Sequence, residues 1–147
     1  MNMTMKMTVA AAMLLATTGL ARADGPSPIE MRQVGMALMS GDFAGIRAVI
    51  AAKGDVKTLE NPLKAMQRWA TLMPSMFPKG TETGGNTKAM PEIWSDSAGF
   101  AKASAALGDA TGVMMAAAKA GDADAVAAAV KGIGDACGAC HKAYRAK

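Results

Sequence analysis

The stretch Asp122–Arg145, DADAVAAAVKGIGDACGACHKAYR, decides how the rest of the chain is interpreted. Its larger side chains recur in alternating steps of four and three, which is the spacing of one face of an α-helix. These side chains are Val126, Val130, Ile133, Cys137, Cys140 and Tyr144. Because Asp122 is a good N-cap, the stretch predicts a helix from about residue 121 to 145 that directs both cysteines into a core.

Within this helix, Cys137-Gly-Ala-Cys140-His141 has the C-x-x-C-H spacing of a c-type haem attachment motif. Two cysteines three residues apart share a helix face, so both thiols can add to the vinyl groups of one porphyrin. His141 follows four residues after Cys137 and stays near that face, so its imidazole can reach the iron. The motif predicts one covalent haem c, with thioethers from Cys137 and Cys140 and His141 as the axial iron ligand.

Three other chemistries are compatible with two cysteines and fit this chain less well. A thioredoxin-like redox pair normally lies near a βαβ pattern, and the sequence shows no strand pattern. A structural zinc site needs four ligands, whereas the chain has two cysteines and one histidine. A plain structural disulfide between Cys137 and Cys140 is the third alternative.

The first of three other helical stretches runs from about Ser27 to Ala52. Apolar residues recur every seven positions, with two more between them, as on a buried helix stripe. They are Ile29, Met36, Phe43 and Ile50, with Met39 and Ile46. Arg32 lies on the same stripe, and a charged group that points into a core needs a partner.

The second helix is expected from about 56 to 73 and the third from 91 or 95 to 120, with a Gly- and Pro-rich linker over 74–92. In the second, Pro62 is either the first helical residue after an Asn61 cap or the site of a kink. The stripe of the second helix comprises Leu59, Leu63, Met66, Ala70 and Met73.

The third helix has large residues at Ile93, Phe100, Leu107 and Met114, and small ones at Ser97, Ser104, Thr111 and Ala118. Such a row of small residues predicts a close approach to a neighbouring helix.

Length and composition agree with a single all-α domain. The chain has 147 residues, 51% of them hydrophobic and only 4% aromatic, with 14 methionines. Alanine and methionine favour helix, and runs of β-branched residues are scarce. We therefore expect an antiparallel four-helix bundle with covalently bound haem c in its core.

Residues 1–23 have the pattern of a secretory signal peptide. Lys6 precedes an apolar run over 9–20, and Ala21-Arg22-Ala23 is a small-x-small cleavage site. A membrane anchor is the alternative, but the run is shorter than the ~20 residues that span a bilayer. No later segment is expected to be long enough to span one. The prediction is a periplasmic domain over 24–147 that starts at Asp24.

The formal charge of +4 falls to +2 in this domain, and its Lys and Arg residues are scattered. Nucleic-acid binding proteins carry clustered basic residues instead. We therefore expect no nucleic-acid partner.

The chain resembles the cytochrome c′ family of class II c-type cytochromes over 27–147. The resemblance is carried by the C-terminal motif through Arg145, by Arg32-Gln33 with Leu38-Met39, and by PEIWSD over 91–96. It implies that Arg145 lies beside the proximal face, Arg32 near the haem propionates and Met36 on the distal side. Gln33 and Tyr144 are implied as further haem contacts. Arg32 could instead extend to solvent.

The resemblance also implies a five-coordinate, high-spin iron that binds NO or CO or carries one electron, and no enzymatic activity. A peroxidase would need a distal acid–base residue, usually a histidine, and the only histidine is His141. The alternative is a low-spin electron carrier similar to cytochrome c-556, with a methionine as the sixth ligand. Methionines near the expected haem level are Met31, Met36, Met39 and Met66.

The family usually dimerises through its first two helices, so we expect a homodimer with an unknown periplasmic redox partner. Apolar residues outside the main stripe could form its interface. They are Val34, Leu38, Ala48, Val49 and Trp69.

Overall fold

The structure is a computed structural model that describes residues 25–147, so the predicted signal peptide lies outside the described residues. The described part is helical, and its single isolated β-bridge joins Ala89 to Arg145. The α-helices are α1 (Pro28–Ala51), α2 (Glu60–Leu72), α3 (Glu92–Ser95), α4 (Ser97–Ala120) and α5 (Ala123–Tyr144). Two 3-10 turns, η1 (Val56–Leu59) and η2 (Met73–Met76), flank α2.

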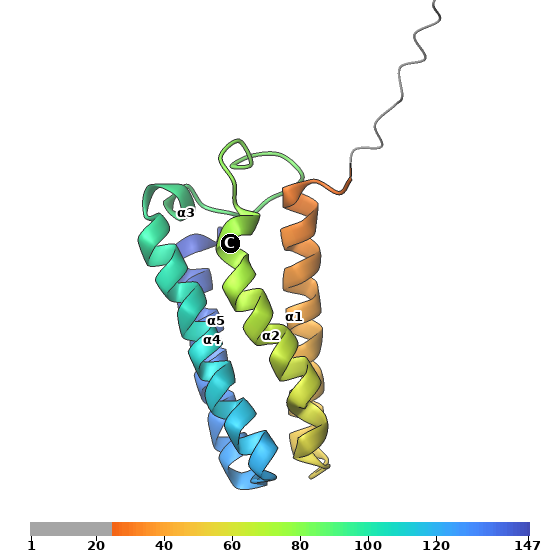
Figure 1. The fold of residues 1–147 in the computed structure, drawn as a ribbon. Helices are drawn as coiled ribbons and strands as arrows, with labels where there is room; N and C mark the ends of the chain where they lie inside the picture. The colour runs from red at the N-terminus through yellow and green to blue at the C-terminus, as the bar shows by residue number, and fades with distance from the viewer. Residues whose placement is uncertain (1–24) are drawn as a thin grey trace, which may run out of the picture.

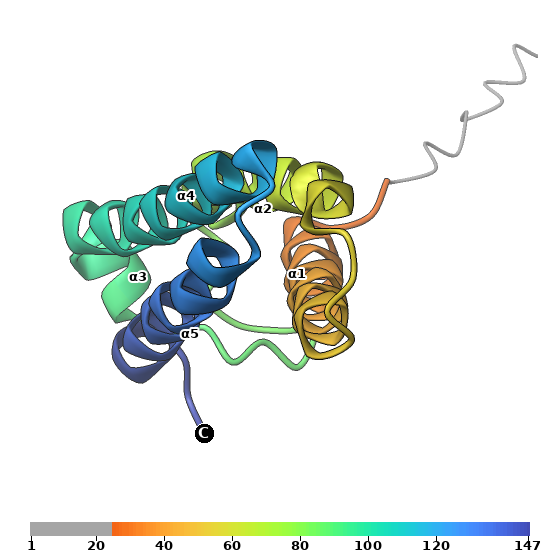
Figure 2. The same ribbon diagram turned by 90° about the horizontal axis from the view of Figure 1, so that it is seen from below.

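The four long helices form an antiparallel bundle, as predicted. Figure 1 shows α1 and α4 running down and α2 and α5 running up, with the segment between η2 and α3 crossing one end. In the end view of Figure 2, α2 and α4 form one side, while α1 and α5 stand apart on the other. The long crossing segment therefore closes the end of the bundle at which the C-terminus of α5 lies.

Local chemistry explains where the helices begin. Ser27 caps α1 in a reciprocal capping box with Glu30, and Pro28 occupies the first turn. The Asp122 side chain accepts a hydrogen bond from the backbone of Ala125 and caps α5. Gly121, with φ of 73°, ends α4 in the left-handed conformation that glycine adopts at low cost. These boundaries agree with the sequence prediction to within one or two residues.

Two expected helices are interrupted. The second begins as the 3-10 turn η1 and becomes α-helical at Glu60, so Asn61 is not its cap and Pro62 lies in the first turn of α2. A proline causes no loss there, because amide groups of the first turn have no partner within the helix. The third is broken at Asp96, whose side chain caps α4 by accepting from Gly99 N at 3.0 Å.

The large residues of the stripes predicted for the second and third helices are buried. In α5, Val126, Ile133 and Tyr144 are buried, whereas Val130, Cys137 and Cys140 are partly buried. The predicted close approach also occurs, because the Ser104 hydroxyl donates to the Ala70 carbonyl of α2 at 2.6 Å. A side-chain carbon at Gly108 would lie 3.6 Å from Ala70 Cβ. The small residues of α4 therefore allow the α2 backbone to approach closely.

Helix α1 packs much less completely than the others. Its buried residues are Arg32, Gly35 and Ile46. With 24 residues it is long and apolar enough to cross a membrane, so the prediction that no segment after residue 23 is long enough was wrong. One such helix is weak evidence for a span, and α1 carries a buried arginine within the bundle. Its apolar outer surface requires another explanation.

The double role of Asp96 generates a stability prediction. Asp96 caps α4 and also accepts a hydrogen bond from the Tyr144 hydroxyl of α5 at 3.0 Å. We expect Asp96→Ala to lower the free energy of unfolding by about 2 kcal/mol, from loss of a cap and of a hydrogen bond to a charged group. Asp122→Ala, which removes only a cap, should cost about 1 kcal/mol. Guanidinium unfolding measures both, and equal losses would contradict the added role of Tyr144.

Candidate haem site

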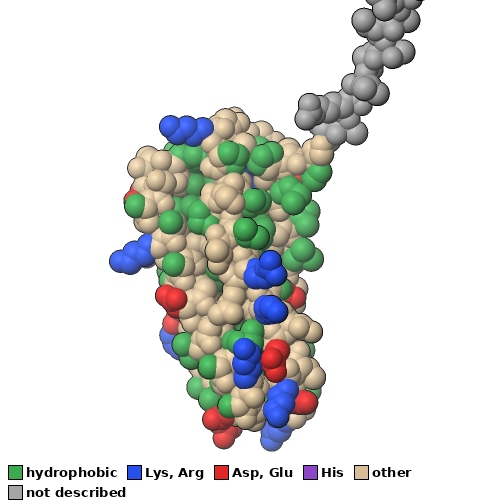
Figure 3. Space-filling model, in the orientation of Figure 1, with side chains coloured by type: hydrophobic (Ala, Val, Ile, Leu, Met, Phe, Trp, Pro, Cys, Tyr) green, Lys and Arg blue, Asp and Glu red, His purple; other side chains and the backbone are tan. Residues whose placement is uncertain are grey.

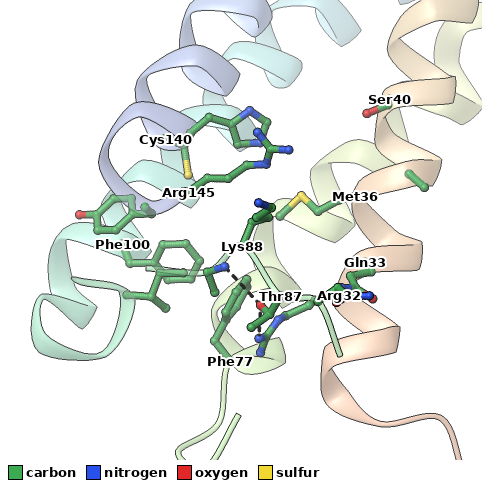
Figure 4. Close-up of a pocket in the computed structure, with 16 residues that line it drawn as sticks. Arg32, Gln33, Met36, Ser40, Phe77, Thr87, Lys88, Phe100, Cys140 and Arg145 are labelled. Atoms are coloured by element: carbon green, nitrogen blue, oxygen red, sulfur yellow. Dashed lines mark hydrogen bonds between the residues drawn. The ribbon is translucent and has the colours of Figure 1, made fainter. Parts of the chain in front are cut away.

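A cavity of about 460 Å³ lies between α1, α5 and the segment that crosses the bundle end. A second cavity of about 190 Å³ extends toward the bundle interior. Both are lined by Met36, Ser40, Cys140 and His141. Figure 4 shows the larger cavity, with Met36 reaching in from α1 and Cys140 from α5.

The predicted attachment residues meet at these two cavities: Cys140 and His141 line both, and Cys137 lines the inner one. Cys137 and Cys140 are partly buried, and both thiols are free rather than joined in a disulfide. Burial raises the pKa of each thiol. Burial, followed by the charge of Arg145, lowers the pKa of the His141 imidazole. A lower pKa favours the neutral imidazole, which is the form that binds a metal.

Met36 is the central side chain on the α1 side of the site. Its neighbours in the inner cavity are mostly apolar, and no second histidine is present in the chain. Met39 and Met66 line only the inner cavity, whereas Met31 lines neither and is 45% exposed. Of the four candidate methionines, Met36 alone therefore borders both parts of the site.

Arg32 is buried, so the alternative of extension to solvent is wrong. Its guanidinium donates to the Thr81 carbonyl at 2.7 Å, and to the hydroxyls of Thr81 and Thr87 at 2.8 Å each. A longer bond of 3.5 Å reaches the Met76 carbonyl, and the guanidinium carbon lies 4.5 Å from the centre of the Phe77 ring. Burial lowers the pKa of Arg32, and the charge of Glu82 opposes this effect. Arg32 thus holds the crossing segment against α1.

The remaining predicted contacts also line the larger cavity. Gln33 is exposed and donates to the Gly85 carbonyl at 2.8 Å, which adds a second link between α1 and the crossing segment. Tyr144 is buried, and burial and its hydrogen bond to Asp96 raise the pKa of its phenol. Arg145 follows α5 and forms the β-bridge to Ala89. The structure therefore brings all eight predicted site residues to one region.

Sequence analysis missed Ser40, Lys88 and Trp69 as lining residues. Lys88 belongs to the crossing segment, whose length was the only signal available. Trp69 was assigned to an exposed interface, yet its ring is partly buried, packs on the core and lines the inner cavity. Its position depends on a glycine of α1, which no helical periodicity indicates.

The donor set fits a covalent haem better than the alternatives. Two free thiols and the imidazole border the inner cavity, and the Cys140 thiol and the imidazole also border the larger one. Arg32, Lys88 and Arg145 border the larger cavity, which has no carboxylate among its lining residues. Apolar walls suit a porphyrin, and the cations suit its two carboxylates. Within residues 25–147, no group of three or more His, Cys, Asp or Glu side chains could hold a separate metal ion.

Comparison with known proteins agrees with this geometry. The family model described as cytochrome C′ matches residues 27–145. Cytochrome c′ of Rubrivivax gelatinosus is 33% identical over 121 residues, which cover 81% of this chain and 94% of that protein. The crystal structure of cytochrome c′ from Thermochromatium tepidum has a TM-score of 0.75 at 31% identity, over 82% of this chain and 95% of that one.

A nitric oxide complex of a variant of cytochrome c prime from Alcaligenes xylosoxidans has a TM-score of 0.72 at 34% identity. The match covers 82% of this chain and 94% of that one. The family model spans the whole bundle and the attachment motif, and the match covers at least 94% of each of the three relatives named. The chain therefore belongs to the cytochrome c′ family, whose members bind haem c.

Proposed function

We propose that this chain is a periplasmic haem protein with a five-coordinate, high-spin iron that binds NO or CO and carries one electron. Cys137 and Cys140 form the thioethers, and His141 is the axial ligand. The observation that carries the proposal is Met36, which reaches into the cavity from α1 while the attachment motif lines it from α5. Haem supplies the iron for gas binding and electron transfer.

The walls around Met36 favour small neutral ligands. Apart from the Ser40 hydroxyl, the Ser104 hydroxyl, which is engaged with Ala70, and the indole N–H of Trp69, the inner cavity is lined mostly by methionine, aromatic and alanine side chains. Such walls offer little hydrogen bonding to a polar bound ligand, so NO and CO are favoured. Related structures from Alcaligenes xylosoxidans contain nitric oxide and carbon monoxide, respectively. This agrees with a role in binding gas rather than in catalysis.

Cations at the mouth of the larger cavity fit the haem carboxylates. Arg32, Lys88 and Arg145 line it without a compensating acidic side chain. The guanidinium of Arg32 already donates to Thr81 and Thr87. Within the described residues, Lys88 donates only to the Lys147 carbonyl. We assign the exposed side chains of Lys88 and Arg145 as the direct partners of the propionates, and the buried Arg32 as the charge behind them.

A homodimer is the partner that the outer surface of α1 supports. The outer apolar face comprises Met31, Val34 and Leu38 of α1 together with Leu72 of α2, all between 45% and 62% exposed. Figure 3 shows hydrophobic side chains gathered over the upper part of α1. Of the expected interface residues, Val34, Leu38 and Ala48 are exposed, whereas Val49 and Trp69 are partly buried. The revised interface therefore omits the last two residues.

The haem assignment is tested by mass and by extraction. We expect the loaded protein to have the mass of residues 24–147 plus one haem, and acid–acetone to leave that haem attached. Cys137→Ala/Cys140→Ala should retain none after extraction, because both thioether bonds are lost. Complete extraction of haem from the wild-type protein would contradict the covalent assignment.

The coordination state is tested through the visible spectrum. We expect a high-spin ferrous spectrum that shifts when CO is added. Moving the Met36 side chain aside costs on the order of 1 kcal/mol, so Met36→Ala should bind CO about fivefold faster. Met31→Leu, at a position that lines neither cavity, serves as the control. A sharp low-spin band that does not shift when CO is added, and that disappears in Met36→Leu, would establish the c-556-like alternative instead.

Sedimentation equilibrium tests the dimer. At micromolar concentration we expect a dimer for the wild-type protein and a monomer for Leu38→Asp, because a carboxylate would be buried in the interface. Val113→Asp introduces the same charge at a position of α4 that is 66% exposed and outside the outer apolar face. That control should remain a dimer, and a monomeric wild-type protein would refute the interface.

A further inference from the structure

Helix α1 is positioned by very few buried contacts. Of its 24 residues, only Arg32, Gly35 and Ile46 are buried. Arg32 bonds to the crossing segment, and Ile46 lies more than two turns further along the helix. Gly35 is therefore the buried position of α1 nearest to Met36, and what touches Gly35 controls where the Met36 backbone lies.

The neighbour at Gly35 is the indole of Trp69 from α2. A side-chain carbon built at position 35 would overlap three atoms of the ring, Cη2, Cζ2 and Cζ3. The edge of the six-membered ring thus rests directly on the α1 backbone, in space that only glycine leaves free. Gly41 and Gly45 on the same helix differ, since nothing lies within 4 Å of a carbon added there.

Trp69 also belongs to the wall of the site. Its ring lines the inner cavity together with Met36, Met66 and Cys137. Its Nε1 atom is buried and finds no acceptor among the described residues. An unpaired buried N–H is costly, and a leucine or phenylalanine at position 69 would avoid that cost. We therefore attribute the role of Trp69 at the site to the size and reach of its ring, not to its N–H group.

We propose that Trp69, seated on Gly35, is a positioning residue that sets the depth of Met36 in the cavity and thereby limits access of a gas to the iron. This proposal rests on the proposed function. The ring acts as a spacer between α2 and α1, one residue away from Met36. Because interiors are close-packed, a change of one methyl group at this contact must move either the ring or the helix.

The test is a double-mutant cycle on the haem-loaded protein. Gly35→Ala forces α1 away from the ring, so Met36 withdraws and the CO association rate rises. Trp69→Leu removes the ring edge, and in the Gly35→Ala background it makes room for the added methyl group. We expect the two effects on the rate to be non-additive by about threefold or more, with the double variant closer to the wild-type protein than Gly35→Ala is.

Gly45→Ala is the matched control, because it adds the same methyl group to the same helix in open space. It should leave the CO rate and the spin state unchanged. Additive effects of Gly35→Ala and Trp69→Leu on the CO association rate would refute the proposal. They would refute it even if the two substitutions were coupled in the free energy of unfolding. A Gly35→Ala rate equal to that of the wild-type protein would refute it as well.

The positioning role of Trp69 can be tested separately even if the five-coordinate assignment is wrong. If the wild-type iron is low-spin and ignores CO, the five-coordinate assignment is wrong, and Met36 is then its ligand. In that case Gly35→Ala should convert part of the spectrum to high-spin, and Trp69→Leu in the same chain should reverse the conversion. A low-spin spectrum that is unaltered in Gly35→Ala would overturn the positioning role alone.

Discussion

The buried guanidinium of Arg32 is the interaction on which the architecture of the site depends. A cation removed from water must be paired or fully hydrogen-bonded, and the partners here come from a segment more than forty residues away. Satisfying Arg32 folds the crossing segment over the end of the bundle, where Lys88 and Ala89 meet the end of α5. One buried charge thereby links α1 to the lid of the cavity.

An aromatic cluster supports the same arrangement from below. The Phe77 ring lies under Arg32 and makes edge contacts with Phe100 and Trp94, at centroid distances of 4.9 and 6.0 Å. Phe100 in turn contacts Tyr144, whose hydroxyl donates to Asp96 at the start of α4. Phe77 directly follows η2, and the other three residues come from α3, α4 and α5, so the cluster joins the crossing segment to three helices at this end of the bundle. The chain has few aromatic residues, and most of them are concentrated here.

The sequence predicted features that depend on local spacing. The stripes of the second and third helices, the Asp122 cap and the direction of both cysteines toward the site follow from local sequence, and the structure has each of them, whereas the stripe of α1 is mostly only partly buried. The 3-10 turn before α2 and the break at Asp96 were missed, because they depend on how short turns pack rather than on period. The contacts of Lys88, Trp69 and Thr87 were missed for a related reason, since each depends on a long-range neighbour.

Haem attachment depends on residues close together in the sequence, whereas access to the iron depends on residues far apart in it. Attachment needs two thiols and an imidazole on one helix, so α5 alone can specify it, and any bundle that buries this face would suffice. Access to the iron depends on the distance between two helices, which here involves a glycine and a tryptophan 34 positions apart. Substitutions at those two positions can alter gas binding while the attachment motif stays intact. Relatives with the same motif can therefore differ in ligand affinity without any change in how the haem is held.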